Sequence, residues 1–135
     1  MASINRYSLF LLRERRNLLR VCLNENNNQI ALMRFSTPEL DTRNSNTAYL
    51  HNVEVANTHR NSRIGTRLLD KMDLYLKINN PEVNKIQGVL WDDQSNPYLH
   101  HFFRKNGYDL EYNLESVYDD GNTIIDVIPI LKNLN

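Results

Sequence analysis

Residues 53–69 read VEVANTHRNSRIGTRLL, an apolar strand that passes through a short polar loop into an amphipathic helix. The first amide N–H groups of a helix have no partner within the helix, and the helix dipole adds partial positive charge there. Phosphate groups are therefore favoured ligands at such a junction. Gly65 permits a close approach to the backbone because it has no side chain. This stretch predicts a phosphate-binding loop over residues 60–66.

A second informative segment, residues 89–108, reads VLWDDQSNPYLHHFFRKNGY. It predicts a strand that ends near Trp91 and a helix that begins at Asn96, because proline is favoured at the first helical position, here Pro97. Gly107 is expected to end this helix in a left-handed conformation.

These two segments, in this order, resemble the two signature motifs of the GCN5-related N-acetyltransferase (GNAT) family. The acetyl-CoA loop of that family is usually written Gln/Arg-x-x-Gly-x-Gly/Ala; here Arg60 stands first, Arg63 replaces the first glycine and Gly65 stands last. The other motif opens a helix with Asn and closes it with a sequence like Phe-Tyr-x-x-x-Gly-Phe. Here Asn96 opens the helix, and Phe103 stands where many members have Tyr.

The resemblance implies an α/β (α+β) fold, with a GNAT-like mixed, mostly antiparallel sheet and helices on its faces. Members of the family usually have two helices between their first two strands, whereas residues 13–17 leave room only for a turn. We therefore expect one acetyltransferase-like domain over residues 1–135 that lacks the usual first two helices.

The spacing of apolar and turn residues predicts the individual elements. The expected strands are 7–12, 18–23, 29–35, 48–55, 85–91, 108–114 and 123–131, and the expected helices are 63–77 and 96–106. Residues 36–47 are expected to form a loop. Residues 8–20 have an alternative interpretation as a helix, because Leu12 and Leu19 lie two turns apart with good helix formers between them.

The resemblance also implies that acetyl-CoA is the co-substrate. Its pyrophosphate would lie on the amides of residues 61–66, beside the cations Arg60, Arg63 and Arg67. Its thioester would lie between the strand ending at Val55 and the strand ending at Trp91, with its carbonyl oxygen on a backbone N–H. The residues implied in cofactor binding are Val53, Val55, Arg60, Asn61, Ser62, Arg63, Ile64, Gly65, Thr66, Asn96 and Phe103. A solvent-exposed basic helix start is the alternative interpretation of the arginines.

The implied reaction is N-acetylation, in which an amine attacks the thioester directly and a base accepts the amine's proton. Candidate bases are Tyr49, His51 and Glu54 on the central strand, and Asp92 beyond the next strand. Strand alternation predicts Tyr49, His51 and Val53 on one face and Glu54 on the other. A hydrogen-bonded structural histidine and a solvent-exposed glutamate are the alternative interpretations of His51 and Glu54.

Phe103 cannot protonate the leaving thiolate as a tyrosine would. A thiol pKa of about 8.5 makes the thiolate a fair leaving group, so the missing acid is expected to lower turnover on the order of a hundredfold. Tyr98 or water are the alternative acids. A non-catalytic acyl-CoA-binding module is therefore the alternative function, and a protein-interaction domain is a third.

Carboxylates near the expected acceptor groove favour a cationic acceptor, either a small molecule or a protein amine. They are Asp92, Asp93, Glu111, Glu115, Asp119 and Asp120. A solvent-exposed acidic hairpin is the alternative interpretation. Without the two missing helices the groove is expected to be open unless a second subunit closes it, and the apolar strand 124–131 is a candidate surface for a homodimer.

Composition restricts the other partners. The chain has 16 basic and 16 acidic residues, which disfavours a nucleic-acid partner. Cys22 is the single cysteine, and the apolar run from Leu9 to Leu12 is far too short to span a bilayer, so we expect no membrane association and a cytoplasmic location. His100 and His101 do not predict a metal site, because adjacent helical residues point about 100° apart.

Overall fold

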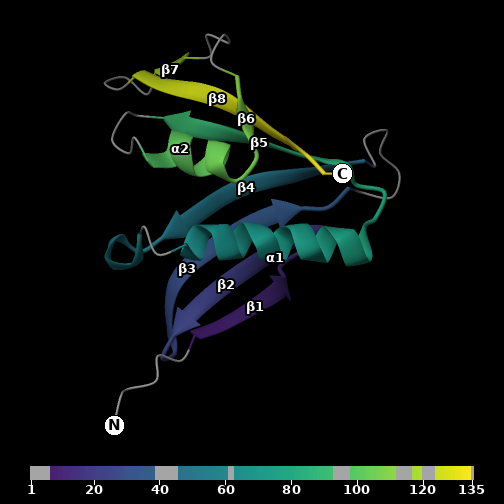
Figure 1. Ribbon diagram of the computed structural model, residues 1–135, viewed down its shortest axis with the longest axis vertical. Coiled ribbons are helices and arrows are strands. Elements are labelled where there is room, and N and C mark those ends of the chain that lie inside the picture. The colour runs from purple at the N-terminus through teal and green to yellow at the C-terminus, as the bar shows by residue number, and fades with distance from the viewer. Residues whose placement is uncertain are drawn as a thin grey trace.

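The computed structural model describes residues 7–38, 46–60, 63–92, 98–111, 117–119 and 124–134 (Figure 1). Its elements are β1 (Tyr7–Arg13), β2 (Leu18–Glu25), β3 (Asn28–Ser36), β4 (Thr47–Val55), the 3-10 turn η1 (Asn57–His59), α1 (Ile64–Asn79), β5 (Lys85–Asp92), α2 (Tyr98–Lys105), β6 (Asp109–Leu110), β7 (Val117–Asp119) and β8 (Ile124–Asn133). This order confirms the expected mixed architecture.

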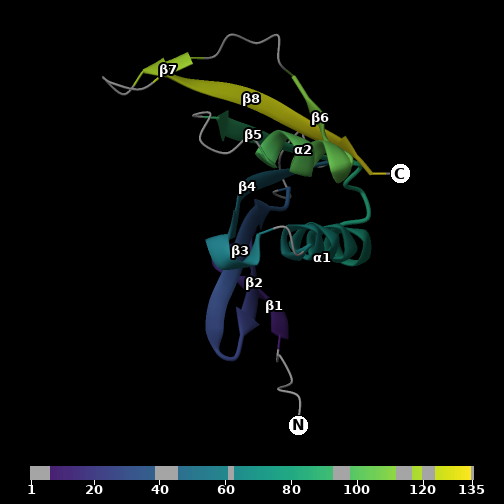
Figure 2. The ribbon, with the colours of Figure 1, turned by 60° about the vertical axis from the view of Figure 1, so that its left-hand side comes forward.

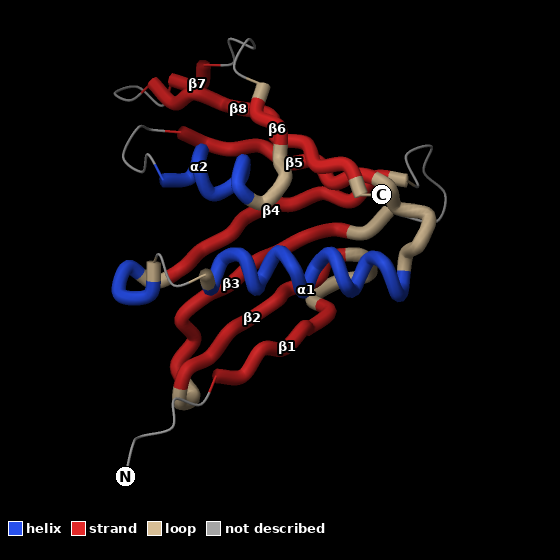
Figure 3. The backbone as a smooth tube through the Cα atoms, in the orientation of Figure 1, coloured by secondary structure: helices blue, strands red, loops and turns tan. Residues whose placement is uncertain are grey.

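The strands form a single sheet in the order β1-β2-β3-β4-β5-β8-β6, with β7 paired to β8 (Figure 3). Its neighbouring strands are antiparallel except for β4 and β5, which are parallel. A parallel pair needs a crossover connection, and α1 supplies it between β4 and β5. The sheet is therefore mixed and mostly antiparallel, as expected.

The first three strands form a continuous meander. Asn26 and Asn27, between β2 and β3, both have positive φ angles, 50° and 73°, which suits a two-residue hairpin turn. Residues 14–17 join β1 to β2 directly, so the usual first two helices of the family are absent from this place, as expected. The alternative helix over residues 8–20 is wrong, because the segment is a strand, a turn and part of a second strand.

One hydrophobic core lies between the sheet and the two helices. From α1 it takes Ile64, Leu68, Leu69, Met72 and Leu76, and from α2 it takes Phe103. These residues pack against the same sheet face, which carries Leu19, Met33, Phe35, Ile86 and Ile130 among others. Figure 2 accordingly shows α1 and α2 on one side of the sheet. We call the opposite side, over which no described helix lies, the open face.

The position of the C-terminal strand in the sheet differs from the exposed position that we predicted for it. We expected residues 124–131 to be exposed, but β8 lies inside the sheet, paired with β5 on one side and with β6 and β7 on the other. Ile128 and Ile130 are buried in the core. The expectation that this strand is an exposed edge is therefore wrong, because both of its edges are occupied along much of its length. A homodimer stays a prediction.

Candidate active site

The site begins where β4 and β5 separate. The two strands pair only from Thr47 to Leu50 and from Lys85 to Gly88, although they continue to Val55 and Asp92. Figure 3 shows them diverging beyond this point. This divergence confirms the expected gap. Because backbone groups of a strand point alternately to its two sides, some N–H groups of residues 51–55 point into the gap.

Gly88 lies at the apex of this gap. A Cβ atom at this position would lie 2.8 Å from the carbonyl oxygen of Leu50, which is closer than such atoms normally approach. A glycine is therefore required for β5 to reach β4 before the two strands separate. No local sequence pattern marks Gly88, because its role depends on the neighbouring strand.

A β-bulge in β4 changes which residues share a face. Arg34 pairs with Asn52 and Phe35 pairs with Leu50, so His51 is the extra residue. Beyond the bulge, Val53 pairs with Met33, which lies in the core. Val53 therefore lies on the helix-covered face.

The bulge corrects the expected alternation of Tyr49, His51, Val53 and Glu54. Tyr49 and Glu54 are paired with Ser36 and Leu32, which belong to the open face. The Nε2 atom of His51 forms a hydrogen bond with the Ser36 hydroxyl. Tyr49, His51 and Glu54 therefore share the open face, and the expectation that His51 and Glu54 lie on opposite faces is wrong.

The start of α1 forms the phosphate-binding candidate. Its N-cap residue, Arg63, makes no capping hydrogen bond with its side chain, and its first turn has no acidic residue. The N–H groups of this turn and the positive end of the dipole therefore favour an anion. Arg60, Arg63 and Arg67 are all exposed around it. Ile64 is buried in the core, so its contribution would come from its backbone. Asn61, Ser62 and Asn96 lie outside the described residues.

The loop before α1 is tied to the sheet through His59. The Nε2 atom of this residue lies 3.3 Å from Oε1 of Glu25 at the end of β2. A hydrogen bond from Tyr7 lowers the pKa of the Glu25 carboxyl, and His59 acts in the same direction. Tyr7 and Glu25 therefore anchor η1 to the edge of the sheet that lies nearest the loop.

Gly65 has a packing role that sequence analysis did not anticipate. A Cβ atom at this position would lie 2.7 and 2.8 Å from two carbons of the Phe102 ring. The missing side chain thus leaves room for the Phe102 ring of α2. Phe103 is 5% exposed and makes edge-to-face contacts with Phe102 and Tyr108, so it contributes to the core.

A cavity of about 660 Å³ lies beside the apex of the gap. Its lining residues come from β4, β5, the β6 region and β8: Tyr49, Gln87, Gly88, Val89, Asp109, Leu110, Glu111, Pro129, Ile130 and Leu131. Tyr49, Gln87, Leu131 and Asp109 are successive partners across the strands, so the cavity adjoins the open face.

The cavity contains one of the carboxylates that we expected near the acceptor, Glu111, and one that we did not, Asp109. Residue 109 was expected in a strand, but the face to which its side chain points is set by its pairing with Leu131 of β8. The side chains of Asp92, Asp93, Glu115, Asp119 and Asp120 lie outside the described part of the chain.

The described residues contain no group of three or more His, Cys, Asp or Glu side chains that could hold a metal ion. Within the same part of the chain, no helix is long and apolar enough to cross a membrane.

Comparison with known proteins gives a family and a fold. A family model described as the acetyltransferase (GNAT) family matches residues 2–108. The ribosomal-protein-S18-alanine N-acetyltransferase from Escherichia coli is 17% identical, with a TM-score of 0.68 over 90% of this chain and 72% of that chain. A GNAT family acetyltransferase from Streptococcus pneumoniae is 16% identical, with a TM-score of 0.70 over 87% and 68% of the two chains.

The PaiA N-acetyltransferase from Thermoplasma acidophilum, solved in complex with coenzyme A, is 17% identical, with a TM-score of 0.62 over 87% of this chain and 61% of that chain. Comparison with curated protein sequences gives no match.

Proposed function

Because the chain belongs to the GNAT family of acetyltransferases, we propose that it is an acetyl-CoA-dependent N-acetyltransferase that moves an acetyl group to a cationic amine. The observation that supports this most is the continuity of the site. The β4–β5 gap runs from the basic start of α1 to its apex at Gly88, and the acidic cavity begins at that apex.

In this proposal the start of α1 binds the pyrophosphate of acetyl-CoA. The N–H groups of the first helical turn would donate to the phosphates, and Arg60, Arg63 and Arg67 would neutralise their charge. The thioester would then lie in the gap, with its carbonyl oxygen near the N–H of Val53 or Val55. Such a donor stabilises the negative charge that develops when the amine attacks.

We assign the role of general base to His51. An alkyl amine with a pKa near 10.4 is mostly protonated at neutral pH, so a base must accept its proton before attack. The bulge places the exposed His51 next to the strand position of Tyr49, which lines the cavity. Glu54 lies farther along β4, near the phosphate end of the gap.

The leaving thiolate would depart without a tyrosine acid. Phe103 has no hydroxyl, and the hydroxyl of Tyr108 is buried with no hydrogen-bond partner among the described residues. Burial raises the pKa of Tyr108. Tyr98 is 66% exposed at the first turn of α2, where it or water could supply the proton. The alternative function, a non-catalytic acyl-CoA-binding module, draws its support from this missing acid.

An acceptor screen tests the proposal. Thiol release from acetyl-CoA would be followed with polyamines, aminoglycosides, lysine-containing peptides and neutral amino acids, at low and high salt. We expect cationic acceptors to be used best and their KM to rise with salt, because salt screens their attraction to the carboxylates. If CoA raises the Tm but no amine is acetylated, the chain is a binding module.

The double variant Asp109→Asn/Glu111→Gln tests the acidic cavity. We expect it to raise the KM for a cationic acceptor by about tenfold with little change in kcat, because loss of ground-state attraction mainly affects binding. The exposed Glu82 lies away from the cavity, and Glu82→Gln is the matched control. An unchanged KM in the double variant would mean that these carboxylates do not bind the acceptor.

A further inference from the structure

The open face of β1–β4 leads from the β1–β2 turn to the cavity. Leu18 of β2 pairs with Ser36, Ser36 with Tyr49, and Tyr49 with Gln87 of β5. The backbone N–H of Glu14 donates to the carbonyl of Leu18, which places the β1–β2 turn at the same end of the sheet. The turn and the cavity thus lie along one row of residues that crosses the strands.

The β1–β2 turn is strongly basic. Arg13, Arg15 and Arg16 are exposed. Glu14 lies 2.5 Å from Arg20 and 3.0 Å from Arg34, so its charge is already shared by two other arginines. Among the described residues, no carboxylate forms an ion pair with Arg13, Arg15 or Arg16. We call these three residues the arginine turn.

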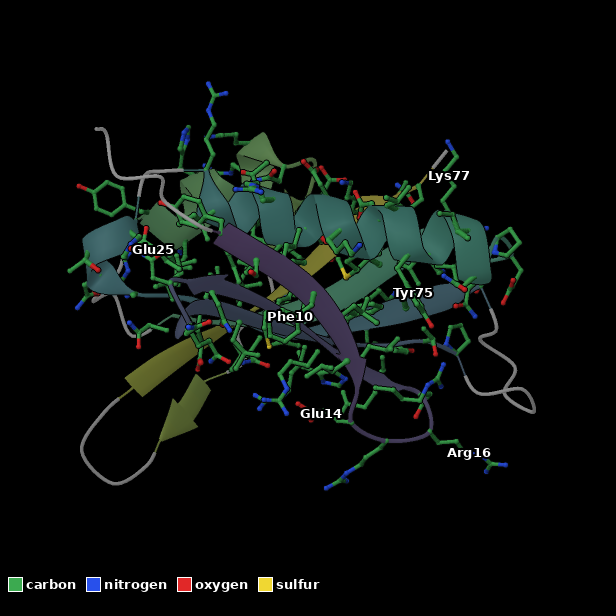
Figure 4. All side chains as sticks on the ribbon, turned by 90° about the horizontal axis from the view of Figure 1, so that it is seen from below. Phe10, Glu14, Arg16, Glu25, Tyr75 and Lys77 are labelled. Carbon is green, nitrogen blue, oxygen red and sulfur yellow. The ribbon has the colours of Figure 1, made fainter. Side chains whose placement is uncertain are left out.

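The arginine turn lies on the side of the molecule that an acceptor would approach. In Figure 4, Phe10, Glu14 and Arg16 lie away from α1, whereas Tyr75 lies between α1 and the sheet. The ion pairs of Glu14 with Arg20 and Arg34 also place Glu14 on the open face. Both arginines alternate along their strands with core residues and therefore belong to that face.

The two ends of this row of residues have opposite charge: the arginine turn is positive and the cavity is negative. The arginine turn attracts anionic groups, whereas Asp109 and Glu111 at the cavity attract cations. A nucleic acid, which is anionic throughout, would be repelled at the cavity end. An extended peptide with a basic amine at one point and acidic residues at another would match both ends.

The distance between the arginine turn and the cavity determines how many residues separate the acidic residues of such a peptide from its amine. Three strand intervals separate β2 from β5, or about 14 Å at the usual strand spacing. An extended peptide advances about 3.3 Å per residue. Allowing for the reach of arginine side chains, acidic residues would lie about four to six positions from the acceptor amine.

We infer that the acceptor is an amine of a polypeptide that lies extended across the open face, with acidic residues on the arginine turn. This inference rests on the proposed function, and it names the class of substrate. Within the described part of the chain no helix lies over this face, because a turn at residues 14–17 stands where the family usually has two helices.

Two lysine peptides that differ only in a Glu-Glu or Gln-Gln pair about five positions from the lysine test the inference. We expect the acidic peptide to have about a tenfold higher kcat/KM, since each exposed ion pair contributes modestly. In Arg15→Glu/Arg16→Glu the ratio of the two rates should fall to one or below. Arg15→Lys/Arg16→Lys should keep most of the preference, because the charge remains.

Lys77→Glu is the matched control, because Lys77 is exposed on the outer side of α1 (Figure 4); this variant should keep the wild-type ratio. Binding of the labelled acidic peptide, followed by fluorescence anisotropy, gives a second readout that does not need turnover, and it should weaken with the same charge reversal.

Equal rates for the two peptides, or a preference that survives the charge reversal, would overturn the inference. So would tighter binding of an RNA oligonucleotide than of the acidic peptide. Acetylation of small amines but of no peptide would overturn the inference and leave the proposed function intact. No acetylation of any amine would overturn both.

Discussion

At the scale of single residues, Arg63 shows how a departure from a family motif can be tolerated. It precedes α1 with φ 65° and ψ 11°, a left-handed conformation that costs a non-glycine residue about 1–2 kcal/mol. The family motif has glycine at this position. The strain indicates that the guanidinium has a use that offsets its cost, and the phosphates of acetyl-CoA are the candidate partner.

Arg63→Gly should therefore separate stability from binding. We expect the free energy of unfolding to rise by up to about 1 kcal/mol, because the strain is relieved. CoA affinity should fall by about tenfold, because a charge-assisted hydrogen bond is lost. Chemical denaturation and titration calorimetry measure the two effects. Arg63→Ala is the control, since it removes the charge and keeps the strain; CoA affinity equal to wild type in both variants would show that Arg63 does not contact phosphate.

His51 is the residue on which the proposed chemistry depends. His51→Gln should lower kcat by about a hundredfold or more and leave CoA affinity unchanged, because the base acts on the acceptor amine and not on the cofactor. His101, an exposed histidine of α2, supplies the control variant His101→Gln. A wild-type kcat in His51→Gln would assign the base elsewhere, with Glu54 as the next candidate.

At the scale of elements, the contact between α1 and α2 depends on Gly65 and Phe102. Alanine is normally favoured over glycine in a helix by about 1 kcal/mol. Here a Cβ atom would collide with the Phe102 ring, so Gly65→Ala should instead destabilise the protein by about 1–3 kcal/mol. Thermal unfolding measures this effect.

The double variant Gly65→Ala/Phe102→Leu tests whether the collision with the Phe102 ring causes this loss of stability. Removing the ring should restore much of the lost stability, so the two changes would be non-additive. A higher Tm in Gly65→Ala alone would contradict the contact. CoA affinity measured in the restored double variant then reports on the phosphate loop without the packing defect.

A second pair of elements, α1 and β8, is joined by a partly buried ion pair. The Nζ atom of Lys132 lies 2.7 Å from Oδ2 of Asp73 and 5.7 Å from the centre of the Tyr108 ring. Burial raises the pKa of the Asp73 carboxyl, and the hydrogen bond from Lys132 opposes this rise.

Lys132→Met should leave Asp73 without its cation and cost about 1–3 kcal/mol at neutral pH. The pKa of Asp73 in the folded state should rise further above its unfolded value. Because the folded state then binds the proton more tightly, the lost stability should return as the pH falls through the folded pKa. Denaturation at several pH values measures this. The control, Asp73→Asn/Lys132→Met, should lack that pH dependence; a loss equal at all pH values would contradict the role given to Asp73.

At the scale of the whole molecule, most elements could be predicted because their signals are local. The alternating leucines of β1 and β2, the two asparagines between β2 and β3, and the helical period from Ile64 to Leu76 all lie within one element or turn. The order of strands and helices followed from them, together with the two motifs.

The details that shape the site depend on contacts between strands. The bulge at His51 arises from the register of β4 against β3, and no local pattern marks it. Gly88 is needed because the carbonyl oxygen of Leu50 lies next to it. Asp109 lines the cavity because its pairing with Leu131 sets the face to which it belongs. The motif residues of the candidate site could therefore be named from the sequence, whereas residues whose role depends on strand pairing could not.

Amide hydrogen exchange tests most directly the central claim, that acetyl-CoA lies with its phosphates at the start of α1 and its thioester in the β4–β5 gap. Exchange would be measured residue by residue for the free protein, with CoA and with acetyl-CoA. Both ligands should slow exchange at residues 63–66, and acetyl-CoA alone should further slow it at Val53 or Val55, since only the thioester has the carbonyl oxygen. Unchanged exchange at both places, under conditions where the ligand raises the Tm, would contradict the account.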